Sequence, residues 1–440
     1  MDSAKILEIL ASYNRFWAGE DVDSGIEREM LGSLLSQLAS REVVVLKGVR
    51  RSGKSTLLAQ VIRHLVDSGT NPLSILRVNL EEPLFSAGLS VELLERIYRT
   101  YREKVYPKGR CSLFLDEIQN VPDWEKWVRG RNETENIKIY IAGSSATMLS
   151  REIGTKLTGR QVSFEVFPLS FKEFLRFHDL EIGSEIEYLN SRSLIRHLFG
   201  KYAKYGGFPE VVLAPNTEGK ELLLKNYFED ILYRDIAARH EIRDVANLRN
   251  LAVYLLTNTA RQTSINKLKN NFSISQDKTE NYVSALLESY LLFQLQKFSY
   301  SLKSTMRAGF KAYAVDTGVR NRIAFTFSED SGWMIENIVF LHLRQRHEEV
   351  YFLAGGTETD FVVKEGVRLT RRIQVWYDDP AVEVIPGREL ACFKGDGADN
   401  KGSECILLTN DYSSVVDVNG VKVHSMPVDK FLIFDDPGQK

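Results

Sequence analysis

One short stretch near the N-terminus constrains the fold of this chain most strongly. Residues 48–55 read Gly-Val-Arg-Arg-Ser-Gly-Lys-Ser and match the pattern G-x-x-x-x-G-K-[ST]. Residues 42–47 before them are typical of a buried parallel strand, and residues 56–62 after them have helix periodicity. Strand, glycine-rich turn and helix in this order predict a loop that binds phosphate through backbone N–H groups and the helix N-terminus.

The expected nucleotide contacts are Gly48, Val49, Arg50, Arg51, Ser52, Gly53, Lys54, Ser55 and Thr56. The two glycines let the backbone approach the phosphates, the lysine reaches the β- and γ-phosphates, and the Ser55 hydroxyl ligates Mg²⁺. For the two arginines, a contact with phosphate or a partner subunit and simple solvent exposure stay open.

Acidic residues follow a second predicted strand. The run Cys111 to Glu117 is short and apolar and ends in two acids, which a parallel strand places at its ligand-binding carboxyl end. Asp116 is expected to hold Mg²⁺, directly or through water, and Glu117 to orient and deprotonate the attacking water. A solvated acidic pair after an ordinary strand is the alternative.

Two further candidates for catalysis come later in the chain. Residues 138–145 predict a strand whose last hydroxyls, Ser144 and Ser145, touch the γ-phosphate or the lytic water, or else form an ordinary turn. Arg160 is a candidate stabiliser of γ-phosphate charge, acting in cis or from a neighbouring subunit, or else a surface arginine.

Bulk properties place the chain among ordinary globular proteins. Its 440 residues suggest about two to four domains. A formal charge of −2 gives no global basic signature, so any nucleic-acid contact requires a local patch. The three widely spaced cysteines favour a reducing cytoplasm. No signal peptide is evident, and no apolar run approaches the roughly 18–20 residues of a membrane span, so we expect a cytoplasmic protein without membrane contact.

The pattern of elements predicts an α/β protein in four parts. Strands and helices alternate from 42 to about 165, which indicates a parallel sheet covered by helices. We therefore expect a P-loop core with N-terminal helices over 1–165 and a helical lid over 166–244. A winged-helix-like domain is expected over 245–308 and an α/β domain over 309–440.

The third part is the expected DNA contact. Three helical patterns precede an apolar strand-like run at 291–295, and Thr279, Tyr282, Val283 and Leu286 are spaced like a recognition helix. In a DNA-binding domain of this kind, the helix over 275–288 would enter the major groove. Local positive charge comes from Lys267, Lys269, Lys278, Lys297, Lys303 and Arg307. Protein contact is the alternative use of such a domain.

Several motifs in order carry a family resemblance. They are Leu-Asp-Glu-Ile-Gln at 115–119, Ala-Gly-Ser-Ser at 142–145, Leu-Thr-Gly-Arg at 157–160, Pro-Leu-Ser-Phe-Lys-Glu-Phe at 168–174 and Gly-Gly-Phe-Pro-Glu at 206–210. With the loop at 48–55, they resemble a family of archaeal and bacterial AAA-type ATPases whose C-terminal domain is similar to PD-(D/E)xK nucleases. The resemblance implies the same fold over nearly the whole chain.

The nuclease-like site departs from the pattern that the resemblance implies. Glu336 and Asp360 fit the helix acid and the first strand acid, which gather Mg²⁺ to activate water. The Glu-x-Lys of the next strand reads Gln374-Val375-Trp376. Glutamine supplies no anionic charge and tryptophan no ammonium group, so we expect a catalytically inactive domain, while residual metal binding at the two acids stays open.

The sequence thus predicts a Mg²⁺-dependent ATPase that couples its nucleotide state to DNA binding or remodelling through residues 245–308 and the C-terminal domain. The alternative is a nucleotide-controlled switch or scaffold that acts on protein partners. Whether the chain forms oligomers stays open.

Overall fold

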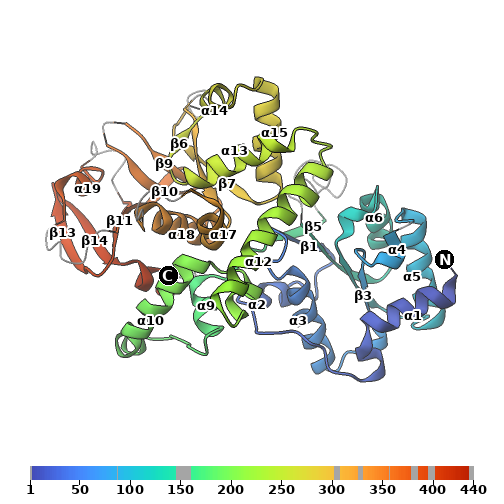
Figure 1. Cartoon of the computed structure of the whole chain (residues 1–440). Helices are drawn as coiled ribbons and strands as arrows, with labels where there is room; N and C mark the ends of the chain where they lie inside the picture. The colour runs from blue at the N-terminus through green and yellow to red at the C-terminus, as the bar shows by residue number, and fades with distance from the viewer. Residues whose placement is uncertain are drawn as a thin grey trace. The chain divides into compact units, whose positions relative to one another are not determined.

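The computed structural model describes residues 2–86, 88–144, 160–301, 308–325, 331–355, 357–377, 385–394 and 402–435. The chain divides into two compact units (Figure 1). The first unit comprises Met1–Val166 and Glu288–Tyr290, and the second comprises Phe167–Leu287 and Leu291–Lys440.

The first unit is built on a five-stranded sheet in the order β2-β3-β4-β1-β5. Every strand pair in it is parallel, which confirms the parallel sheet expected from the alternating pattern. The strands are β1 Val43–Lys47, β2 Ile75–Asn79, β3 Cys111–Asp116, β4 Ile137–Gly143 and β5 Gln161–Glu165.

Helices cover both faces of this sheet (blue to cyan in Figure 1). Alternate residues of β1 enter different cores: Val43 and Val45 pack with residues of α1, α5 and α6, whereas Val44 and Leu46 pack with residues of α2 and α3. This alternation follows from the period of two in a strand. The helices are α1 Ser3–Tyr13, η1 Arg15–Ala18, α2 Leu31–Leu35, α3 Lys54–Asp67, η2 Pro72–Ser74, α4 Pro83–Ser86, α5 Val91–Lys104, η3 Ile118–Asn120 and α6 Trp124–Thr134.

The second unit contains a nine-stranded mixed sheet in the order β13-β14-β12-β11-β10-β9-β7-β8-β6. Figure 1 shows β13 and β14 in red at one end and β6, with the yellow helices α13, α14 and α15, at the other. The strands are β6 Gln262–Thr263, β7 Leu292–Lys297, β8 Phe310–Ala314, β9 Val350–Leu353, β10 Thr359–Glu365, β11 Arg368–Trp376, β12 Glu404–Thr409, β13 Ser414–Val418 and β14 Val421–Pro427.

The second unit begins at Phe167, and its first helix, α9, begins at Phe171. Ser170 and Glu173 form the expected capping box at the start of α9. The helices are α9 Phe171–Arg176, α10 Glu185–Tyr205, α11 Pro209–Leu213, α12 Thr217–Asp230 with its π-helical continuation η4 Ile231–Ala238, α13 Val245–Thr257, α14 Ile265–Phe272, α15 Gln276–Glu288, α17 Thr317–Ile323, α18 Ser331–Arg346, α19 Gly387–Ala391 and α20 Val428–Phe434.

The nine-stranded sheet crosses the boundary expected at 308/309. β7 pairs antiparallel with β8 and parallel with β9, so the strands after α15 belong to the same sheet as the C-terminal strands. The three helices expected within 245–308 are present as α13, α14 and α15, with β6 between the first two and β7 after the third. The winged-helix fold and the division into four parts stay predictions. No helix in the described part of the chain is long and apolar enough to span a membrane.

Candidate functional site

The turn after β1 has the backbone shape that the glycine pattern predicts. Gly48 has φ 151° and Gly53 has φ 98°. A Cβ on Gly48 would lie 2.1 Å from the carbonyl oxygen of Val166, so the backbone at Val166 leaves no room for a side chain at this position. Gly53 immediately precedes α3, so the N-terminus of this helix follows directly on the loop.

The lysine of the loop is folded over the turn. Lys54 Nζ donates hydrogen bonds to the carbonyl oxygens of Gly48 at 3.0 Å and Val49 at 2.8 Å. Arg28, which precedes α2, donates from Nη1 to the Ser52 carbonyl at 2.8 Å and is itself buried. The loop is thus stabilised by its own lysine and by Arg28, which belongs to the N-terminal region and not to the motif.

The two expected magnesium ligands share a neighbour. Arg77, on β2, lies with its Nη2 atom 3.5 Å from the Ser55 carbonyl oxygen and 3.6 Å from Asp116 Oδ2. Asp116 is the last residue of β3 and is 3% exposed. One arginine therefore lies close to both the Ser55 backbone and the Asp116 carboxylate at the carboxyl edge of the sheet, and binding of Mg²⁺ by these two residues stays a prediction.

Glu117 is positioned by a left-handed backbone turn and by an amide. It has φ 54°, a left-handed backbone conformation that is uncommon for a residue other than glycine. Gln119 Nε2 donates to Glu117 Oε2 and lies 3.3 Å from Ser144 Oγ at the end of β4. Burial raises the pKa of Glu117, while Lys54 opposes that rise. A carboxylate of raised basicity beside the loop is suited to accept a proton from water.

Three buried oxygen atoms around this site have no hydrogen-bond partner within the described residues: Ser52 Oγ, Asp116 Oδ1 and Gln119 Oε1. Buried polar atoms in proteins are almost always paired, so such a group points to a ligand. Oxygen donors such as the Asp116 carboxylate and the Ser55 hydroxyl suit Mg²⁺, which usually keeps several waters and substrate phosphates as its other ligands. The residues present therefore fit a magnesium–nucleotide complex.

The structure does not bring Arg160 to this site. Its carbonyl oxygen accepts a hydrogen bond from the Val43 backbone N–H, so Arg160 lies at the amino end of β1, whereas the loop follows the carboxyl end. The five residues of β1 separate the two ends by about 16 Å at roughly 3.3 Å per residue. Of the alternatives open for Arg160, this arrangement speaks against action in cis, and action from a neighbouring subunit stays a prediction.

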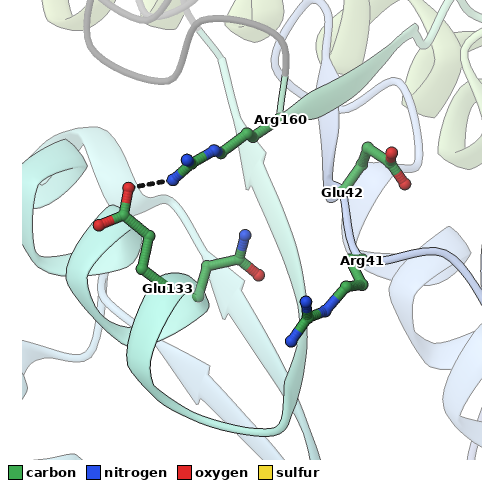
Figure 2. Close-up of a pocket in the computed structure, with 5 residues that line it drawn as sticks. Arg41, Glu42, Glu133 and Arg160 are labelled. Carbon is green, nitrogen blue, oxygen red and sulfur yellow. Dashed lines mark hydrogen bonds and ion pairs between the residues drawn. The ribbon is translucent and has the colours of Figure 1, made fainter.

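Arg160 instead forms an ion pair with Glu133 of α6. Figure 2 shows this pair beside Arg41 and Glu42, where together with Asn132 they line a cavity of about 250 Å³. The side chain of Arg160 is 53% exposed, which leaves it accessible to a neighbouring molecule. Ser145, the other hydroxyl expected near the γ-phosphate, lies outside the described residues.

In the second unit, Glu336 and Asp360 lie together as expected, and a third acid and a lysine join them. Lys311 Nζ on β8 lies 3.0 Å from Glu336 Oε1, 2.7 Å from Glu358 Oε1 and 3.7 Å from Asp360 Oδ1. Across the described residues, no group of three or more His, Cys, Asp or Glu side chains is arranged to hold a metal ion.

The four residues of α15 that are spaced like a recognition helix lie in the core. The structure buries Thr279, Tyr282, Val283 and Leu286, so they form the inner face of α15, and DNA binding by this helix stays a prediction. A spacing of three and four marks one face of a helix but does not say whether that face is buried or exposed. Lys278 forms an ion pair with Asp244. The expected basic residues Lys303 and Arg307 lie outside the described ranges.

Comparison with known proteins matches a family model described as an AAA domain to residues 40–175 and a model for a domain of unknown function to residues 196–330. An uncharacterized protein of Methanocaldococcus jannaschii is 34% identical over 339 residues, which is 74% of this chain and 73% of that protein. An uncharacterized protein of Haemophilus influenzae is 30% identical over 409 residues, which is 90% of this chain and 96% of that protein. The chain therefore belongs to the same family as these relatives, and its residues 40–175 match an AAA domain.

Solved structures show weaker similarity. A Walker-type ATPase of Pyrococcus abyssi matches 69% of this chain and 97% of its own at 15% identity, with a TM-score of 0.45. The ORC1 protein of Aeropyrum pernix, solved in complex with DNA, matches 68% of this chain and 92% of its own at 14% identity, with a TM-score of 0.31. Scores this low carry no inference about function.

Proposed function

We propose that this chain is a Mg²⁺-dependent ATPase whose nucleotide state controls what its second unit binds. The observation that carries the proposal is the convergence of Lys54, Ser55, Asp116 and Glu117 at one edge of the parallel sheet, where buried oxygen atoms of the described residues stand without partners. Phosphoryl transfer needs a phosphate cradle, a metal position and a held water, and the residues present supply all three.

Each residue has a defined task in this account. Lys54 exchanges its two carbonyl contacts within the loop for phosphate oxygens. Glu117, oriented by Gln119, accepts the proton of the attacking water, and Ser144 Oγ accepts a second hydrogen bond from the same Nε2 atom of Gln119. When bound with nucleotide, Mg²⁺ neutralises charge on the phosphates, and Ser55 and Asp116 would hold it. Arg160 remains proposed only for action on a neighbouring subunit.

DNA is the first candidate for the ligand of the second unit. The described basic residues outside α15 include Lys267, which is exposed on α14, and Lys269 on the same helix. Contacts from α14 to phosphate would be independent of sequence and sensitive to salt. With Gln374 and Trp376 in place of the Glu-x-Lys pair, we propose that the C-terminal domain does not cleave DNA.

A protein partner is the second candidate, and one observation favours it. The exposed face of α15, a helix described over its whole length, carries Asp277 and Glu280, and its one basic residue, Lys278, is paired with Asp244. Two acids on this face would repel DNA phosphates. Half of the residues that line the neighbouring cavity of about 560 Å³ are uncharged and polar, such as Asn266, Ser284 and Gln294.

The two candidates separate in one experiment. ATP hydrolysis is measured with and without single-stranded, duplex and branched DNA, for wild-type protein and for Lys267→Glu/Lys269→Glu. The control is Lys225→Glu on α12, an exposed lysine of the same unit. If DNA binding is coupled to hydrolysis, DNA should stimulate ATP hydrolysis by the wild type and by the control, and the double variant should lose this stimulation. DNA binding by the double variant should also depend less on salt than binding by the wild type.

The protein-binding switch would be favoured if the rate of ATP hydrolysis is the same in all samples and the protease digestion pattern differs between ATP and ADP. Identical digestion patterns with ATP, with ADP and without nucleotide would contradict both.

A further inference from the structure

Lys311 is a buried lysine surrounded by acids from separate elements. Its side chain is 4% exposed, and its ammonium group faces Glu336 of α18, Glu358 just before β10, and Asp360 of β10. Nζ also lies 5.5 Å from the centre of the Phe352 ring on β9, which can attract a cation. Lys311 therefore satisfies three carboxylates with a single ammonium group.

Other groups hold the acids in place around the lysine. The Tyr313 hydroxyl, two residues further along β8, donates to Glu336 Oε1 at 2.7 Å. Asp360 Oδ2 accepts from the Val375 backbone N–H of β11 at 3.0 Å. These two carboxylates are thus fixed by partners outside the ion pairs. Both lie close to one point, the position of the Lys311 nitrogen, which we call the focus of the cluster.

Strand β11 supplies no cation to this focus from the positions where the family pattern places one. Gln374 Oε1 accepts from the Asp360 backbone N–H at 3.2 Å, and its Nε2 donates to Glu389 at 3.2 Å, so both ends of its amide are used. Trp376 packs in a separate apolar cluster with residues such as Phe393 and Leu407. Within the described residues, the positive charge at this focus comes from Lys311 of β8.

An ammonium group and a divalent cation compete for such a focus. Both are drawn to converging carboxylates, and each repels the other, so a buried lysine at the centre excludes the metal. A divalent ion also needs oxygen atoms at roughly 2.0–2.6 Å, closer than the 2.7 Å and 3.0 Å that separate Lys311 Nζ from its two nearest acids. The acids are arranged around a nitrogen atom rather than around a metal ion.

We propose that Lys311 is the resident cation of the cluster formed by Glu336, Glu358 and Asp360, and that it keeps divalent metal out of this site. The cluster is then an internal ion-pair lock between β8, α18 and the start of β10. Removing the positive charge while keeping the length of the side chain should convert the cluster into a divalent-cation site. This inference does not depend on the proposed ATPase activity.

The test is Mn²⁺ binding to the nucleotide-free full-length chain, followed by the electron paramagnetic resonance signal of free Mn²⁺. Lys311→Met removes the charge, and Lys311→Arg is the matched control that keeps it. We expect Lys311→Met to bind Mn²⁺ at this cluster at least about tenfold more tightly than the wild type does. Adding Asp360→Asn to Lys311→Met should abolish the gain, and Lys311→Arg should show none.

Two results would overturn the proposal. One is a folded Lys311→Met protein that gains no Mn²⁺ site. The other needs no lysine variant: the wild type and Asp360→Asn are compared directly, and a wild-type Mn²⁺ site that Asp360→Asn removes would show that Lys311 does not exclude metal. DNA cleavage is assayed separately, so metal binding without cleavage leaves the proposed lack of nuclease activity intact.

Discussion

Replacing Gln119 with alanine should slow ATP hydrolysis without weakening ATP binding. Its amide contacts Glu117 Oε2 and Ser144 Oγ, so it joins the proposed base to the end of the neighbouring strand. In Gln119→Ala the carboxylate loses the group that orients it, while the phosphate contacts of the loop stay in place. Gln119 is therefore a positioning residue in this account.

The size of the effect follows from the bond that is lost. A hydrogen bond to a charged group contributes about 1.5–3 kcal/mol. If that free energy appears wholly in the chemical step, kcat falls by roughly 10- to 150-fold at about 1.4 kcal/mol per factor of ten. KM for ATP should change little, because an interaction that acts on the water rather than on the nucleotide is made in the transition state.

The pH profile provides a second readout that a purely structural role would not move. Burial raises the pKa of Glu117, and the Gln119 hydrogen bond opposes this rise. A base works only when deprotonated, so activity is lost as the pH falls through its pKa. Gln119→Ala should raise that pKa further and shift the acid limb of kcat/KM to higher pH.

Steady-state kinetics of Gln119→Ala are compared with those of Gln37→Ala, whose amide donates to Ser36 Oγ in the turn after α2. The control should behave like the wild type. A Gln119→Ala protein with unchanged kcat and an unchanged acid limb would refute the reasoning.

Three further results follow from the structure. Gly48→Ala should lower the free energy of unfolding by at least about 2 kcal/mol and weaken ATP binding, because its Cβ would lie 2.1 Å from the Val166 carbonyl oxygen; thermal unfolding and a nucleotide titration measure both. Gly206→Ala should destabilise the second unit by roughly 2–4 kcal/mol in denaturant unfolding, because its φ is 75° and its Cβ would lie 2.0 Å from Asp316 Oδ1. Burial raises the pKa of Asp316 to about 6, so its contribution to stability is present at low pH and is lost as the pH rises through about 6; unfolding measured across that range should show this loss, and Asp316→Asn should remove it.

The sequence is sufficient to predict the nucleotide loop and the strand that ends in Asp116, because these depend on local patterns. A glycine pattern between a strand and a helix fixes the loop, and an apolar run that ends in acids fixes the edge of the sheet. The parallel direction of the strands is also accessible, since alternating strands and helices allow few other arrangements.

Contacts between distant residues are not accessible in the same way. Gln119 meets Ser144 because β3 and β4 are neighbours in register, and Arg77 meets Asp116 because β2 lies on the other side of β3. Lys311 of β8 reaches Glu336 of helix α18 and Asp360 of β10, although the order of strands in the mixed sheet puts β7 and β9 between β8 and β10. No local pattern encodes that order.

Two interpretations share a physical limit, because a local pattern does not specify what surrounds it. The spacing of Thr279 and Leu286 is typical of a recognition helix, although a period near 3.6 describes the buried face of any helix equally well. The motif around Arg160 suggests a phosphate contact, although the residue that precedes a parallel strand lies at the edge opposite to the nucleotide loop.

ATP hydrolysis by the wild type and by Glu117→Gln, measured alongside ATP binding, tests the central claim most directly. The account predicts Mg²⁺-dependent turnover by the wild type, and a variant that binds ATP but turns it over at least about a hundredfold more slowly, because the attacking water has lost its base. Equal rates of hydrolysis in the two proteins would contradict the role of Glu117 and the account of this site.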